Sequence, residues 1–78
     1  MAKEYIRILI ETDEIYEWIK EIPYIFNSTI FQGVIVLNFP NRSTLDCVLE
    51  EILTGKFSSK IEWKSFTRTR LIVYHKEL

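Results

Sequence analysis

The most constraining feature of this sequence is a strand-like stretch, with a period of two, on both sides of one glycine. The pattern covers residues 24–39, with Gln32-Gly33 near its middle and Val34-Ile35-Val36-Leu37 after it. A period of two is typical of β-strands, and glycine gives the backbone freedom that a tight turn requires. The pattern therefore predicts a β-hairpin over residues 24–39, which ends at Pro40 and Asn41.

The residues after this hairpin change to a helical period. Ser43-Thr44-Leu45-Asp46 resembles a capping box in which Asp replaces the usual Glu, and Gly55 suits the position just past a helix end. We predict a helix over residues 43–54. Its apolar stripe consists of Leu45, Val48, Leu49, Ile52 and Leu53.

The residues before the hairpin show a strand-like period of two, followed by a helical period. Residues 5–10 are rich in β-branched side chains that alternate, which predicts a first strand. Thr12 is a good helix cap, and Pro23 interrupts a helix. We predict a helix over residues 13–22, whose apolar residues are Ile15, Trp18, Ile19 and Ile22.

The last part of the chain, residues 60–76, has strand character throughout. This stretch is much longer than the usual strand of about five or six residues. It can form one long, bent strand or two strands that turn near Thr67-Arg68-Thr69. Because such a turn would lack Gly, Asn, Asp and Pro, a single long strand is favoured.

The predicted order is βαββαβ, which indicates an α+β, ferredoxin-like sandwich. In it, two helices cover one face of a four-stranded antiparallel sheet that ends in a long C-terminal strand. With 78 residues, the chain is expected to form one domain over residues 1–78. The predicted helix-facing side of the sheet holds Ile6, Ile8, Ile10, Ile35, Leu37 and Phe39.

The residue types that carry chemistry are sparse. Cys47 is the single cysteine and His75 the single histidine, so neither a cysteine-based zinc site nor an intramolecular disulfide is expected. His75 is expected at the surface, and Cys47 as a partly buried structural thiol. Both glycines stand alone, so a Gly-rich phosphate loop is not expected either. We therefore predict a protein that is not an enzyme and that uses no cofactor or metal.

The location of the protein is predicted from what its hydrophobic segments could do. No segment approaches the roughly 20 apolar residues that cross a bilayer, and the first residues do not resemble a signal peptide. We expect a cytoplasmic protein without a membrane partner.

The net charge of −1 conceals an uneven distribution. Residues 1–55 hold nine acidic and four basic side chains, a net charge of −5. Residues 56–78 hold two acidic and six basic side chains, a net charge of +4. Such a division marks either a polar binding face or acidic helices beside a basic strand.

The sheet face opposite the helices is the predicted binding surface. On a monomer its apolar side chains would form an exposed patch, and such patches usually bind other proteins. The long last strand would also offer an edge for pairing with another chain. We predict a homodimer, or an accessory or inhibitory subunit of a larger complex. The predicted partner-binding residues are Val34, Val36, Phe66, Arg68, Arg70, Ile72 and Tyr74.

The alternative is an RNA-binding domain whose partner is RNA or a ribonucleoprotein. Residues 32–39 resemble the octapeptide of the RNA-recognition-motif family, and residues 53–57 are similar to the segment after that family's second helix. Val34 and Val36 stand where that family has its stacking aromatic residues, and Gln32 replaces a basic residue. The residues predicted for RNA are Tyr5, Arg7, Lys64, Phe66, Arg68, Arg70 and Tyr74.

A second resemblance involves the predicted helix that begins at Ser43. The segment Ser43-Thr44-Leu45-Asp46-Cys47-Val48-Leu49 is similar to a leucine-bearing helix in the small dimerising subunit of the KEOPS tRNA-modification complex. That family usually ends on a long helix, whereas this chain is predicted to end in a strand. The resemblance implies self-association within a larger assembly.

Overall fold

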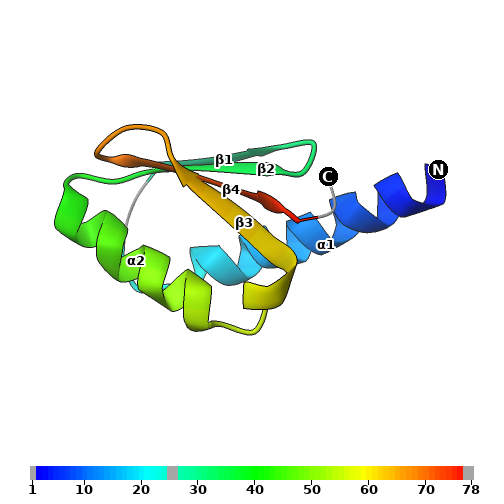
Figure 1. Ribbon diagram of the computed structural model, residues 1–78, viewed down its shortest axis with the longest axis horizontal. Helices are drawn as coiled ribbons and strands as arrows, with labels where there is room; N and C mark the ends of the chain where they lie inside the picture. Colours follow the sequence, from blue (N-terminus) through cyan, green and yellow to red (C-terminus); the bar gives the residue numbers. More distant parts are fainter. Residues whose placement is uncertain (1, 25–26, 77–78) are drawn as a thin grey trace.

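The computed structural model describes residues 2–24 and 27–76. In these residues it contains helices α1 (Ala2–Lys20) and α2 (Arg42–Thr54) and the short 3-10 helix η1 (Ser58–Lys60). The strands are β1 (Asn27–Phe31), β2 (Val34–Asn38), β3 (Ile61–Ser65) and β4 (Arg70–His75). Figure 1 shows α1 and α2 on the same side of the sheet. The predicted α+β class, with two helices and a four-stranded antiparallel sheet, is confirmed.

The sheet has the strand order β1-β2-β4-β3, and each neighbouring pair is antiparallel. Along the chain, the order helix, strand, strand occurs twice. The second strand of each set, β2 or β4, lies in the centre of the sheet, and the first strand lies at an edge. β4 is hydrogen-bonded on both sides, so it offers no free edge to another chain.

The predicted strand over residues 5–10 was wrong, because this segment is helical and continuous with the next one. Ile8, Thr12, Ile15 and Ile19 are buried and lie on one face of a helix at a spacing of three and four residues. Thr12 does not cap a helix; its hydroxyl donates to the Ile8 carbonyl at 2.7 Å. Ile6 and Ile10, predicted to face the helices, are exposed. The observed order is therefore αββαββ rather than the ferredoxin-like βαββαβ.

The single long strand over residues 60–76 was also wrong, since β3 and β4 form a hairpin. The Phe66 amide donates to the Arg70 carbonyl at 2.9 Å, which closes the hairpin at its loop. Within this loop, the Ser65 hydroxyl donates to the Thr67 carbonyl, and the Thr69 amide donates to the Thr67 hydroxyl. Hydroxyl groups thus stabilise a turn that has none of the usual turn residues.

The hairpin formed by β1 and β2 confirms the predicted hairpin over residues 27–38; Tyr24 lies outside β1, and residues 25 and 26 of the predicted range lie outside the described residues. Gln32 and Gly33 have φ angles of 46° and 85°, so both turn residues are in the left-handed region. Two such residues in sequence are typical of the two-residue turns that match the twist of a β-hairpin. This turn places Phe31 directly opposite Val34.

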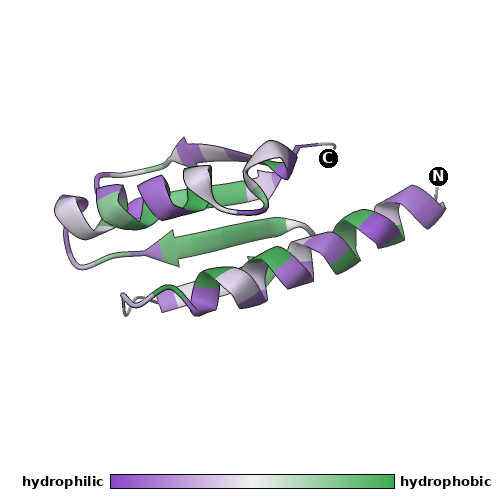
Figure 2. Cartoon of the chain, turned by 90° about the horizontal axis from the view of Figure 1, so that it is seen from below, coloured by the Kyte–Doolittle hydropathy of each residue, from purple (hydrophilic) through white to green (hydrophobic). Residues whose placement is uncertain are grey.

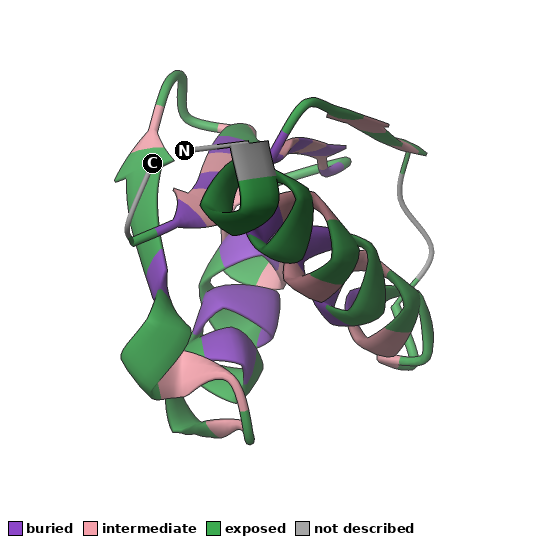
Figure 3. Cartoon of the chain, turned by 90° about the vertical axis from the view of Figure 1, so that its right-hand side faces the viewer, coloured by how far each residue is buried: buried purple, intermediate pink, exposed green. Residues whose placement is uncertain are grey.

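The core lies between the helices and the sheet, where Figure 3 shows the buried segments gathered. Helix α1 contributes Ile15 and Ile19, and the sheet contributes the alternate residues of its central strands. The core cluster comprises Ile15, Ile19, Ile35, Leu37, Phe39, Leu45, Val48, Leu49, Ile52, Ile61, Leu71 and Val73. The predicted inward orientation of Ile35, Leu37 and Phe39 is confirmed by their burial.

Helix α2 begins and ends close to the predicted positions. Its cap is Asn41 rather than Ser43, because the Asn41 side-chain oxygen accepts from the Thr44 amide at 2.9 Å. Gly55 follows the last helical residue, as predicted. A Cβ atom at Gly55 would overlap the ring of Trp18 in α1, so glycine permits the two segments to approach closely here.

Candidate functional site

One face of the sheet is covered by the two helices and the other is not (Figure 1). The strand register pairs Val34 with Tyr74 and Val36 with Ile72 across the two central strands. Residues directly opposite each other in antiparallel strands point to the same face. These four side chains are partly exposed, whereas their neighbours Ile35, Leu37, Leu71 and Val73 are buried against the helices. We call Val34, Val36, Ile72 and Tyr74 the open-face patch.

Two exposed aromatic residues border this patch. Phe31 lies opposite Val34 on the edge strand β1 and is 72% exposed. Phe66 lies just beyond β3, at the other end of the sheet, and is 59% exposed. The Arg70 guanidinium stands 5.7 Å from the centre of the Phe66 ring, and its Nε donates to the Asn38 side chain at 2.8 Å. Arg70 is therefore held along the sheet.

The face carries charge of both signs at its β3 edge. Glu62 lies opposite Tyr74, and Lys64 lies opposite Ile72. With Arg70, the face therefore carries two basic residues and one acidic residue on its strands. The centre of the face is apolar, and charged groups are confined to its margin.

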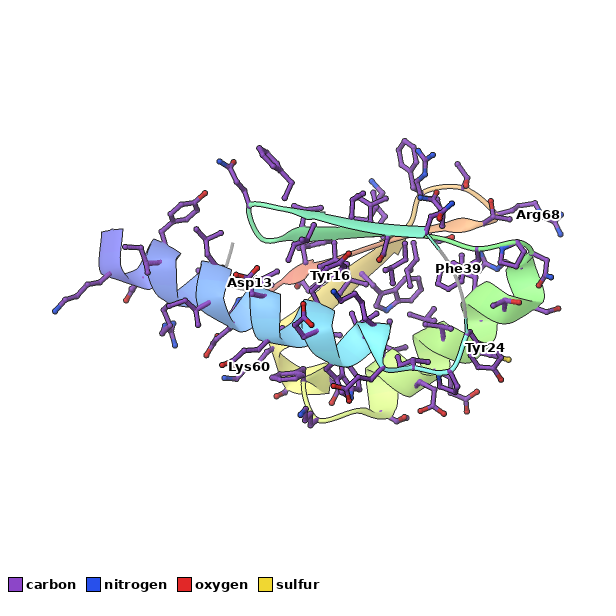
Figure 4. All side chains as sticks on the ribbon, turned by 180° about the vertical axis from the view of Figure 1, so that it is seen from behind. Asp13, Tyr16, Tyr24, Phe39, Lys60 and Arg68 are labelled. Atoms are coloured by element: carbon purple, nitrogen blue, oxygen red, sulfur yellow. The ribbon has the colours of Figure 1, made fainter. Side chains whose placement is uncertain are left out.

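The structure brings together most of the residues that the sequence predicted for this face. Val34, Val36, Phe66, Arg70, Ile72 and Tyr74 form one surface, with Lys64 beside it. Arg68 lies in the loop between β3 and β4, where Figure 4 shows it at the end of the molecule, pointing away. Tyr5 and Arg7 lie on α1 in the helix layer, so they are separated from the sheet residues with which they were grouped.

Sequence reasoning missed Phe31, although the signal was present. A two-residue turn at Gln32-Gly33 fixes Phe31 as the direct partner of Val34. Because Val34 was predicted on the open face, Phe31 follows by register alone.

A second cluster joins α1 to the end of β4. His75 is 3% exposed, and its Nε2 lies 2.7 Å from one carboxylate oxygen of Glu11. The Lys60 ammonium lies 3.0 Å from the other oxygen. These hydrogen bonds, that of Lys60 first and that of His75 second, lower the pKa of the Glu11 carboxyl. His75 was predicted at the surface; its burial under α1 corrects that prediction.

This cluster borders a small hollow of about 90 Å³. The lining residues are Arg7, Glu11, Ser59, Lys60, His75 and Lys76. Both oxygens of Glu11 are already engaged, one by a lysine of η1 and one by the imidazole. The cluster thus fastens α1 to η1 and to the last strand, which is a structural task.

A larger groove of about 390 Å³ lies between α1 and the segment after α2. Its aromatic residues are Trp18 and Phe57, whose rings meet edge to face with centres 5.7 Å apart. Four acidic residues of α1 and its C-terminal extension border it, together with one lysine: Asp13, Glu14, Glu17, Glu21 and Lys56. The groove opens in the helix layer rather than on the open face of the sheet.

Other candidate chemistry finds little support in the part of the chain that the structure describes. Residues 2–24 and 27–76 contain no group of three or more His, Cys, Asp or Glu side chains arranged to hold a metal ion. Cys47, predicted as partly buried, is exposed on α2. None of the helices within the described residues has the length and apolar character needed to cross a membrane.

Comparisons with known proteins return no relative for this chain. No protein-family model, no curated protein and no solved structure matches it.

Proposed function

We propose that this protein is a non-enzymatic interaction module that binds a partner protein through the open-face patch. The observation that carries this proposal is the position of Val34, Val36, Ile72 and Tyr74 on a sheet face that neither helix covers. Contiguous apolar surface of this kind is a usual mark of a protein-binding site. The chain would act as an accessory subunit within a complex, without a cofactor or metal.

The chemistry of the face favours a protein over RNA as the partner. Single-stranded RNA is bound by aromatic platforms within a basic groove. Here the central strands present Val34, Val36, Ile72 and Tyr74 on the open face, and Tyr74 is the one aromatic residue of these four. Arg70 is already engaged by Asn38 and Phe66, and Glu62 offsets part of the positive charge.

The exposed aromatic residues suit a protein interface. Interfaces have an apolar centre and a polar rim, and Phe, Tyr and Arg are enriched in them. Phe31 and Phe66 lie at opposite ends of the open-face patch, with Lys64 and Glu62 along one side. The partner would therefore lie across the strands and cover both phenylalanines.

The test is site-specific photo-crosslinking in an extract of the source organism. Phe31 is replaced by p-azidophenylalanine, which preserves the aromatic ring. The matched control places the same residue at Tyr24, which is 44% exposed and follows α1, on the side of the sheet away from the open face (Figure 4). We expect position 31 to yield a discrete protein adduct and position 24 to yield none.

A second variant links the adduct to the open-face patch. Ile72→Glu places a charge in the centre of the patch and should abolish the adduct at position 31. Leu53→Glu changes an exposed leucine of α2 and should leave the adduct unchanged. An adduct that persists in folded Ile72→Glu protein would overturn the proposal, as would an adduct that nuclease removes, which would favour RNA.

A further inference from the structure

We propose that two copies of this chain associate through the outer stripe of α1, with the two helices antiparallel and Ile10 facing Ile10 across a two-fold axis. The outer stripe consists of Lys3, Ile6, Ile10, Asp13 and Glu17. These residues recur at alternating spacings of three and four, so they lie along one face of the helix. All five are exposed, and Ile6 and Ile10 are 53% and 56% exposed.

The first described residues of α1, Lys3 to Ile6, are all exposed. Figures 1 and 2 show the N-terminal half of the helix projecting past the end of the sheet. Every side chain from Lys3 to Arg7 is exposed, and Ile8 is the first buried one. Because short helical segments are marginal in water without tertiary contacts, an extension of this kind calls for a surface that packs against it.

The charges along α1 identify a second copy as the occupant. Residues 2–10 hold two basic and one acidic side chain, a net charge of +1. Residues 11–20 hold four acidic and one basic side chain, a net charge of −3. An antiparallel pair places the basic half of each helix on the acidic half of the other. A parallel pair would oppose like charges along its length, and it would also align the two helix dipoles unfavourably.

The register follows from the position of the apolar residues. With Ile10 on the two-fold axis, Lys3 of one copy faces Glu17 of the second copy, because the two residue numbers add to twice ten. Ile6 is then level with position 14 of the second copy, between its Asp13 and Glu17. Every contact away from the axis occurs twice in such an isologous pair. The two Ile10 side chains therefore form the centre of the contact, and the ion pairs between Lys3 and Glu17 form its ends.

The groove that contains Trp18 and Phe57 would receive the N-terminal end of α1 from the second copy. Glu17 and Asp13 belong both to the outer stripe and to the border of the groove that contains Trp18 and Phe57. Lys3 of the second copy would bring its ammonium to this acidic border and its aliphatic stem to the aromatic rings. Such a division between stem and charged end is usual for lysine at the edge of apolar surface.

The contact is small, since each copy contributes only Ile6 and Ile10 as apolar residues of the stripe. An interface below roughly 1,200 Å² belongs to the weak class, so we expect a dimer that forms at micromolar concentrations and above. It would leave the open-face patch of each copy uncovered, because α1 lies on the opposite side of the sheet. This inference therefore does not depend on the proposed function.

The first experiment is analytical ultracentrifugation of the wild-type chain and its charge variants over a wide concentration range. Lys3→Glu or Glu17→Lys alone replaces two attractions per dimer with two repulsions, so each should weaken the dimer about tenfold. The double variant Lys3→Glu/Glu17→Lys restores opposite charges only in an antiparallel pair, and it should recover wild-type association. A double variant that stays as weak as the single ones overturns the register.

The second experiment is oxidative crosslinking in a Cys47→Ser background. Ile10→Cys should crosslink with itself, because position 10 lies on the two-fold axis. Glu17→Cys alone should not, but it should crosslink when mixed with Lys3→Cys. Self-crosslinking at position 17 would indicate a parallel pair and overturn the proposal, and so would a wild-type chain that is monomeric throughout.

A control separates this surface from the open-face patch. Ile72→Glu should leave the dimer intact, whereas Ile10→Glu should abolish it without loss of helix in the circular dichroism spectrum. If Ile72→Glu abolishes dimerisation and Ile10→Glu does not, the copies meet through the sheet, and the proposal for α1 is overturned.

Discussion

The two faces of the sheet are made from alternate residues of the same strands, and they have different surroundings. Leu71 and Ile72 are neighbours in β4, yet Leu71 is completely buried beneath the helices and Ile72 is partly exposed on the other side. In β2 the same division separates Val36 from Leu37. Strands that are apolar on both faces are typical of sheets covered on both sides. Within the described residues, only one face of the sheet is covered by helices. We therefore infer that a partner protein covers the other face.

The largest difference should come from truncating these neighbours one at a time. Leu71→Ala leaves a cavity in the core and should lower the free energy of unfolding by about 2–5 kcal/mol. Ile72→Ala removes partly exposed surface and should cost about 1 kcal/mol or less. Chemical denaturation of the two variants measures both values. Equal losses would mean that the open face is already covered in solution.

The covered face depends on how closely the helices approach each other, which Gly55 permits. Gly55→Ala places a methyl group where the Trp18 ring lies, and it should lower the free energy of unfolding by about 1–3 kcal/mol. Glu50→Ala, at an exposed position of α2, should change the free energy of unfolding by about 0.5 kcal/mol or less. Thermal and denaturant unfolding would reveal the difference, and indistinguishable variants would show that the ring moves aside freely.

The packing of the helices on the covered face also depends on the N-terminal cap of α2. Asn41→Ala removes the acceptor for the Thr44 amide and should lower the free energy of unfolding by about 1 kcal/mol. Asn41→Asp retains an acceptor oxygen and should lose less. Denaturant unfolding measures the free energy of unfolding of both variants, and Ile72→Ala is measured in the same experiment for comparison with the open face. A loss in Asn41→Asp as large as that in Asn41→Ala would contradict the capping role.

The smallest effect concerns the edge of the covered face, where Glu11 joins α1 to the end of β4. The pKa of Glu11 is lowered from its ordinary value of 4.5, by hydrogen bonds from Lys60 and then His75. Its contribution to stability is therefore complete above the unfolded pKa and is lost as pH falls through the lower, folded pKa. We expect Glu11→Gln to lack this acid-dependent part of the stability curve.

Thermal unfolding at a series of pH values measures this effect. Glu50→Gln, at an exposed position on α2, serves as the control and should retain the acid-dependent decline of the wild-type protein. If Glu11→Gln declines as steeply as the wild type, the cluster of Glu11, Lys60 and His75 contributes nothing to acid stability.

Local pattern was sufficient wherever one period was unambiguous. The alternation and the turn at Gly33 predicted the first hairpin, and the stripe from Leu45 to Ile52 predicted α2. The segment around Ile8 failed because a short run of alternating isoleucines fits a strand and a helix equally well. The burial of Ile8 and Thr12, on the same helical face as Ile15 and Ile19, extends the helix through this segment, and that burial depends on distant residues.

The candidate site shows the same division. The positions of Val34, Val36, Ile72 and Tyr74 could be predicted, because alternation holds for these strands in any topology. Tyr5 and Arg7 were placed with them only through the predicted first strand. The link between Glu11 and His75 joins residues 64 positions apart, and neither residue has a local signal that identifies the other.

Local sequence patterns were enough to predict the first hairpin, where α2 begins and ends to within a residue or two, and which side chains of β2 and β4 share a face. These features depend on neighbours a few residues apart, whose geometry the backbone period sets. Tertiary contacts are needed to explain why the first segment is a helix, why the last forms a hairpin, and why His75 is buried. Each of these depends on contacts between segments that only the folded chain brings together, and such contacts outweigh local preference.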